Sequence, residues 1–83
     1  MSREEVFEKV VEIAKDVFEL EELDMTDTTT ADDIDEWDSL THMSLISDIE
    51  REFHVTFTLG ERRNPRNFGE LVDVLMGHIE SGR

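Results

Sequence analysis

The sequence contains no cysteine, a single proline and few basic residues. Without cysteine the chain has no disulfide bond, no thiolate metal ligand and no thiol nucleophile, so its stability must come from packing. Eight basic residues stand against 22 acidic ones, which gives a net charge of −14 over 83 residues. Such a chain repels nucleic acid and anionic membranes, because both attract basic surfaces. We expect it to attract basic surfaces of partner proteins instead.

Long hydrophobic runs are also absent. No apolar segment approaches membrane-spanning length. The first ten residues, MSREEVFEKV, alternate charged and apolar side chains and do not resemble a signal peptide. We therefore expect a cytoplasmic, monomeric protein. Eighty-three residues are enough for one domain with a small core, so residues 1–83 are predicted to form a single domain.

Three segments carry apolar residues at helical spacing, which predicts helices over about 3–18, 39–53 and 67–80. Ser2 and Glu5 form a capping-box pattern at the start of the first. The expected apolar positions are Val6, Phe7, Val10, Ile13, Ala14, Val17 and Phe18, then Leu40, Met43, Leu45, Ile46, Ile49 and Phe53, then Phe68, Leu71, Val72, Val74, Leu75 and Ile79.

The connections between these helices differ in character. Residues 19–38 hold ten acids and no Lys or Arg, and we interpret them as a long loop of a kind that often has a function. Residues 54–66 are interpreted as an extended linker that Gly60 ends, followed by a short turn within 61–66. The linker is expected to place Val55, Phe57 and Leu59 in the core. The predicted fold is all-α, a small bundle of three to four helices with a long loop between the first two.

The segment Trp37-Asp38-Ser39-Leu40 opens the second predicted helix. Asp38 is expected to cap this helix, which would leave the hydroxyl of Ser39 free. A helix N-terminus favours a bound or attached phosphate, because its N–H groups and dipole present positive charge. Trp37 is expected to pack onto the core and fix the entry of the chain into the helix. The alternative is that Ser39 is only a capping residue.

Two other kinds of site fit the sequence less well. Ser39 and His42 could form a nucleophile–base pair, but the chain lacks a Gly-x-Ser-x-Gly pattern and the size to enclose a substrate pocket. No catalytic residue is therefore predicted, and His42 is expected at the rim of the helix start. The acidic loop offers carboxylates without the order of an EF-hand, so no metal site is predicted. These carboxylates belong to Asp24, Asp27, Asp32, Asp33, Asp35 and Glu36.

The Asp38-Ser39-Leu40 motif follows an acidic loop and precedes an amphipathic helix that ends at 49–53, and the segment 67–72 closes the pattern. In this setting nearly the whole chain resembles the acyl carrier protein family, most closely its stand-alone members. The resemblance implies that Ser39 carries 4′-phosphopantetheine, with Asp38 and Leu40 beside it. It further implies that a phosphopantetheinyl transferase supplies the group from coenzyme A. An acyl group would be held as a thioester by a carrier that is not itself an enzyme.

The resemblance also implies partners with basic docking surfaces, namely the transferase and enzymes that load or process the acyl group. Met43 is expected to give them an apolar contact, and Asp48 and Glu50 an electrostatic attraction. Fatty-acid carriers have acids at three positions where this chain has Thr41, Ser44 and Arg51. Aminoacyl carriers share the motif and stay open as a possibility. A rival hypothesis is an acidic helical interaction domain without a prosthetic group.

Overall fold

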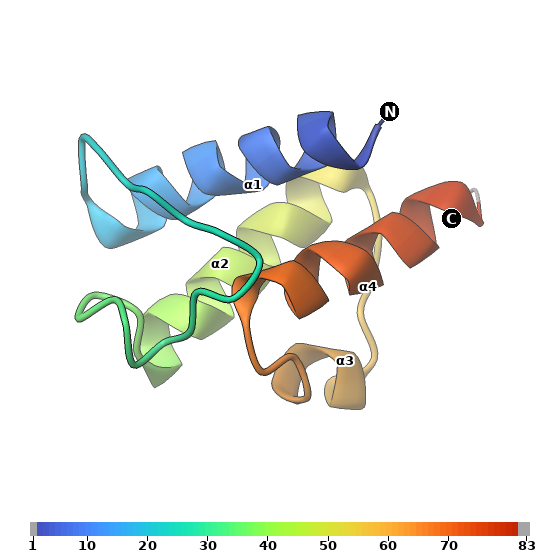
Figure 1. Ribbon diagram of the computed structural model, residues 1–83. Coiled ribbons are helices and arrows are strands. Elements are labelled where there is room, and N and C mark those ends of the chain that lie inside the picture. The colour runs from blue at the N-terminus through green and yellow to red at the C-terminus, as the bar shows by residue number, and fades with distance from the viewer. Residues whose placement is uncertain (1, 82–83) are drawn as a thin grey trace.

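Residues 2–81 fold into four helices joined by one long loop and two short connections (Figure 1). The computed structural model describes residues 2–81. The helices are α1 (Arg3–Phe18), α2 (Ser39–Phe53), α3 (Leu59–Arg63) and α4 (Phe68–Glu80), and the described residues contain no strand. The prediction of an all-α bundle with a long loop between its first two helices is confirmed.

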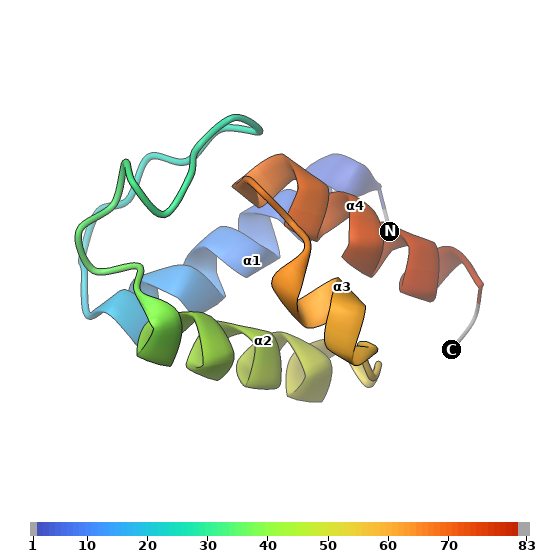
Figure 2. The same cartoon turned by 90° about the horizontal axis from the view of Figure 1, so that it is seen from below.

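The helix α1 packs against both α2 and α4. The short α3 lies against α2 and α4, as Figure 2 shows from below. His42 of α2 contacts the carbonyl oxygen of Arg62 at 2.7 Å, and His78 of α4 contacts the carboxylate of Glu61 at 2.9 Å. Side chains from α2 and α4 therefore hold α3 in place.

The core is built from one stripe on each long helix. On α1 the buried residues recur every four positions, which keeps them on one face. Each such buried side chain of Val or larger size contributes roughly 1.5–3 kcal/mol to folding. The buried residues are Val6, Val10, Ala14 and Phe18 of α1, Leu45, Ile46 and Ile49 of α2, and Phe68, Leu71, Val72 and Leu75 of α4. Met25 and Trp37 of the long loop and Val55 and Phe57 of the linker complete this core.

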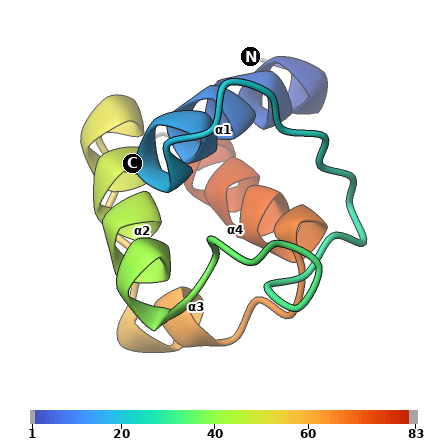
Figure 3. The same ribbon diagram turned by 90° about the vertical axis from the view of Figure 1, so that its left-hand side faces the viewer.

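The long loop crosses one end of the bundle and passes the start of α4 before it reaches α2 (Figure 3). Two of its carbonyl groups cap α4, because the N–H groups of Phe68 and Gly69 donate to the carbonyl oxygens of Thr29 and Asp27 at 2.8 and 2.9 Å. Asn67 caps the next N–H, that of Glu70, with its side chain. The loop is thus part of the helix end.

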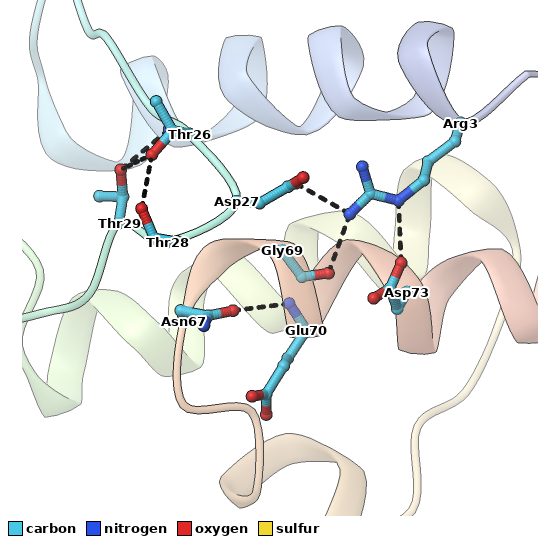
Figure 4. A network of polar contacts seen from close by, with 9 residues as sticks. All are labelled: Arg3, Thr26, Asp27, Thr28, Thr29, Asn67, Gly69, Glu70 and Asp73. Atoms are coloured by element: carbon cyan, nitrogen blue, oxygen red, sulfur yellow. Dashed lines mark hydrogen bonds and ion pairs between the residues drawn. The ribbon is translucent and has the colours of Figure 1, made fainter.

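Arg3 secures the same region from the first turn of α1 (Figure 4). Its guanidinium donates to the carboxylates of Asp27 and Asp73 at 2.9 and 2.8 Å and to the carbonyl oxygen of Gly69 at 3.3 Å. Because the three side chains are partly exposed, we assign each ion pair no more than about 1 kcal/mol. The network joins α1, the loop and α4 at one point.

The start of α3 corrects two expectations. Leu59 was expected in the core, yet its side chain is 62% exposed, and Gly60 lies inside α3. The reason is a capping box. The hydroxyl of Thr58 accepts from the N–H of Glu61, and the carboxylate of Glu61 accepts from the N–H of Thr58. These bonds start a helix immediately after Thr58, which turns Leu59 outward.

Candidate functional site

The start of α2 is capped by Asp38, as predicted. Its carboxylate accepts from the N–H groups of Leu40 and Thr41, each at 2.9 Å. In return the hydroxyl of Thr41 accepts from the N–H of Asp38 at 2.8 Å and donates to the carbonyl oxygen of Glu36 at 2.7 Å. The bond from the N–H of Thr41 is the main reason why the pKa of Asp38 lies below its ordinary value. Asp38 is therefore a charged cap at neutral pH.

Ser39 is the first residue of α2 and is exposed. Within residues 2–81 its hydroxyl has no hydrogen-bond partner. Two of the N–H groups that a helix start normally offers to an anion are already used by Asp38. An anion attached at Ser39 would thus meet the positive end of the helix dipole, with fewer free N–H groups than an uncapped helix end offers.

Trp37 is buried between Phe18 and Phe68, with ring centroids 6.1 and 6.4 Å away. The prediction that it packs onto the core is confirmed. Its indole Nε1–H also donates to Nδ1 of His42 at 3.1 Å. Because an indole can only donate, Nδ1 must be unprotonated, and Nε2–H of His42 then donates to the carbonyl oxygen of Arg62.

These bonds bear on the idea that Ser39 and His42 form a catalytic pair. Both ring nitrogens of His42 are occupied, one by Trp37 and one by Arg62. Neither is free to accept a proton from the hydroxyl of Ser39. The bonds assign His42 a structural role, which links the start of α2 to the end of α3.

A cleft of about 650 Å³ opens beside Ser39, between the start of α2 and the segment that runs from α3 to α4. Its lining combines apolar side chains with three arginines, and among the described residues Asp38 is the one carboxylate that lines it. The lining residues are Ala31, Trp37, Asp38, Ser39, His42, Met43, Arg62, Arg63, Pro65 and Arg66. The sequence analysis missed this cleft, although Arg62, Arg63 and Arg66 form a visible basic cluster in an acidic chain.

The outer face of α2 also differs from the expectation. Leu40 was expected in the apolar stripe, yet its side chain is 82% exposed. Ile49 is nine positions later, which at about 100° per residue is half a turn away, and Ile49 is fully buried. Leu40 must therefore face solvent. Met43, at the edge of the stripe, is half exposed.

Glu50 was expected to be an exposed recognition residue, and the structure contradicts its exposure. Its carboxylate is 18% exposed and accepts from the N–H of Phe57 at 2.7 Å and from the guanidinium of Arg62 at 3.3 Å. Glu50 thus holds the linker and α3 against α2. Asp48 is more exposed and pairs with Arg51 at 3.7 Å.

Among residues 2–81, no three histidine or acidic side chains come together as a metal site. None of the four helices is both long enough and apolar enough to cross a membrane.

The comparisons with known proteins concern the start of α2 and the cleft beside Ser39. A family model described as "Phosphopantetheine attachment site" matches residues 8–75, which include all of α2 and the cleft beside it. Among solved structures, the chain is similar to a holo acyl carrier protein from Geobacter metallireducens, determined by NMR in solution. The two are 34% identical, the match covers 93% of this chain and 88% of that one, and the TM-score is 0.86. No curated protein matches the sequence significantly.

Proposed function

The chain belongs to the phosphopantetheine attachment family, and on that premise we propose that Ser39 is its attachment residue. The family's group, 4′-phosphopantetheine, is held covalently, and the protein functions as an acyl carrier. When attached, the group supplies a thiol that can hold an acyl chain as a thioester. Carrier domains of this kind are not enzymes, so the chain's own residues bind, orient and present the group.

One observation carries the choice of Ser39. Its hydroxyl is exposed and without a hydrogen bond within the described chain, whereas the neighbouring Asp38 performs the capping. A serine that capped the helix would have its oxygen engaged by backbone N–H groups. At Ser39 the hydroxyl is held by a rigid helix end and is open to an enzyme that approaches from solvent.

The attachment reaction requires little from the carrier beyond this presentation. The oxygen of Ser39 forms a bond to the phosphorus that bears pantetheine in coenzyme A. The bond from that phosphorus to the bridging oxygen breaks, and 3′,5′-adenosine diphosphate leaves. The hydroxyl proton passes to a base of the phosphopantetheinyl transferase. Asp38 cannot readily serve as that base, because its carboxylate is engaged by two N–H groups and its pKa is lowered.

The transferase and the acyl-processing enzymes are proposed to dock on the outer face of α2. Leu40 and Met43 give this face an apolar contact next to Ser39, since both side chains are exposed. Asp48 provides the acidic group that a basic partner surface would meet. Glu50 is not included, because its carboxylate is committed to Phe57 and Arg62.

The test is attachment itself. The apo protein is incubated with coenzyme A, magnesium and a promiscuous transferase, and its intact mass is measured. We expect one phosphopantetheine per chain for wild type and for Ser44→Ala, a matched exposed serine of α2, and none for Ser39→Ala. The absence of any mass gain in the wild type would favour the interaction domain without a prosthetic group. A gain in Ser39→Ala would move the site to another residue.

A further inference from the structure

Two arginines near Ser39 have no ionic partner. Within residues 2–81, the guanidinium groups of Arg63 and Arg66 form no ion pair and no hydrogen bond, in a chain with 22 acids. The paired bases are Arg3, Lys15, Arg51 and Arg62. Lys9 is also unpaired, but it lies on α1, away from the cleft beside Ser39. Unpaired positive charge is thus concentrated in that cleft.

The geometry of the cleft keeps these charges free. Asp38 is the one acid in the lining, and its carboxylate is turned to the N–H groups of Leu40 and Thr41. Arg62 also lines the cleft, but its guanidinium is held by Glu50. Within the described residues the guanidinium groups of Arg63 and Arg66 therefore stay without an ion pair, and the carboxylate of Glu70 reaches only the backbone N–H of Arg66, at 3.1 Å.

Such cations would stabilise a phosphodiester attached to Ser39. The group carries a negative charge and would be attached to a protein of net charge −14. Two of the N–H groups that usually receive a phosphate at a helix start, those of Leu40 and Thr41, are occupied by Asp38, which makes the helix end a weaker anion site. Arginine is the side chain best suited to the task, because its planar fork binds phosphate oxygens through two N–H groups.

We propose that Arg63 and Arg66 bind the phosphodiester of the attached arm and hold the adjoining part of the arm in the cleft, an inference that rests on attachment at Ser39. Trp37, Met43 and Pro65 form the apolar part of the lining, which suits the methyl-bearing carbons next to the phosphate. The arm is then docked against the carrier while no partner is bound. A partner must release it to use the thiol.

The experiment compares the apo and holo proteins after intact mass has verified attachment. Arginine side-chain Nε–H resonances and the ³¹P line of the arm are recorded by NMR. Conversion to the holo form should shift the Nε–H signals of Arg63 and Arg66 and leave that of Arg51 in place. Added salt should reverse the shift, because it screens exposed charges.

Variants of equal net charge provide the control. In Arg63→Gln/Arg66→Gln the ³¹P line should narrow, because the phosphate moves freely. In Lys9→Gln/Arg51→Gln, which removes the same two charges elsewhere, it should keep its wild-type width. All four side chains are at the surface, so both proteins should fold. Full attachment with unmoved Arg63 and Arg66 signals would overturn the inference and leave the proposed function intact, as would equal ³¹P lines in the two variants. A wild-type chain that gains no mass would overturn both.

Discussion

The indole of Trp37 and the imidazole of His42 share a hydrogen bond that determines which ring nitrogen of His42 carries its proton. The unprotonated Nδ1 faces Trp37, and the protonated Nε2 faces the carbonyl oxygen of Arg62. His42 thus connects a core aromatic residue to α3.

Trp37→Phe should test this bond, because it keeps an aromatic ring and removes the donor. A half-buried acceptor on His42 would then be unsatisfied, which costs about 1–3 kcal/mol. His42→Ala leaves the Trp37 donor unsatisfied in turn. In a double-mutant cycle followed by urea unfolding, we expect a coupling of about 0.5–3 kcal/mol between the two residues. Strictly additive effects would show that the bond contributes no stability.

Gly69→Ala should separate the loop from α4. A Cβ atom at position 69 would lie 2.7 Å from the carbonyl oxygen of Asp27 and 2.9 Å from its Cα, and backbone atoms cannot move aside cheaply. We expect a destabilisation of about 1–3 kcal/mol. Gly77→Ala is the matched control on α4, because its Cβ would meet nothing within 4 Å. There the gain in helix propensity should stabilise by about 0.5–1 kcal/mol. The two Tm values should move in opposite directions, and a shared direction would contradict the close approach.

The charge of Asp38 should make stability depend on pH. Hydrogen bonds from Thr41 and Leu40 hold the pKa of Asp38 below the ordinary 3.8, so the ionised form is favoured in the folded state. Its contribution is present above the unfolded value and is lost as the pH falls through the lower folded value. Asp38→Asn keeps a good capping oxygen but cannot ionise. Its unfolding free energy should therefore decline less on acidification than that of the wild type.

Asp35→Asn is the control for that variant, since it removes the same charge from an exposed loop position. The unfolding free energy of Asp35→Asn should fall on acidification as it does in the wild type, because Asp38 is still present. If Asp38→Asn and wild type declined in parallel through pH 3.8, the capping bonds would not be favouring the charged form.

Leu40→Ala should slow attachment without affecting the fold. The side chain is too exposed to stabilise the core, so unfolding free energies should agree within about 0.5 kcal/mol. Loss of an apolar contact beside Ser39 should lower the kcat/KM of the transferase for the carrier several-fold. This corresponds to a loss of about 1 kcal/mol in the free energy of binding between carrier and transferase. Leu59→Ala, an exposed leucine at the start of α3, is the control and should be modified at the wild-type rate. Equal rates for all three proteins would remove Leu40 from the docking face.

Much of the fold could be predicted because its determinants are local. The capping box of Ser2 and Glu5, the cap Asp38, and the apolar spacing of the long helices are all features of neighbouring residues. The burial of Trp37 followed from its place before a cap. The direction in which each helix turns its apolar face was predicted less reliably. Leu40 was assigned to the apolar stripe of α2 because the predicted stripe was too wide.

The features that escaped prediction depend on contacts between different helices and loops. The carboxylate of Glu50 turns inward because the N–H of Phe57 lies in the linker beyond the end of α2. The cleft exists because the end of α3 and the connection after it bring Arg63 and Arg66 to the same cleft as Ser39, and nothing in the local sequence gives that placement. The hydrogen bond between Trp37 and His42 could be predicted only from the path of the loop that places the indole beside the imidazole.

The carbonyl caps on α4 also have a kinetic consequence. They join Asp27 and Thr29 to residues about forty positions later in the chain. Helical domains usually fold fast because most of their contacts are local, whereas a distant pairing must first overcome the entropy of closing a long loop. We therefore expect α1, α2 and most of α4 to form early, and the first turn of α4 to close only when the acidic loop settles across it. The loop that leads to Ser39 would then be among the last parts of the molecule to acquire its native shape.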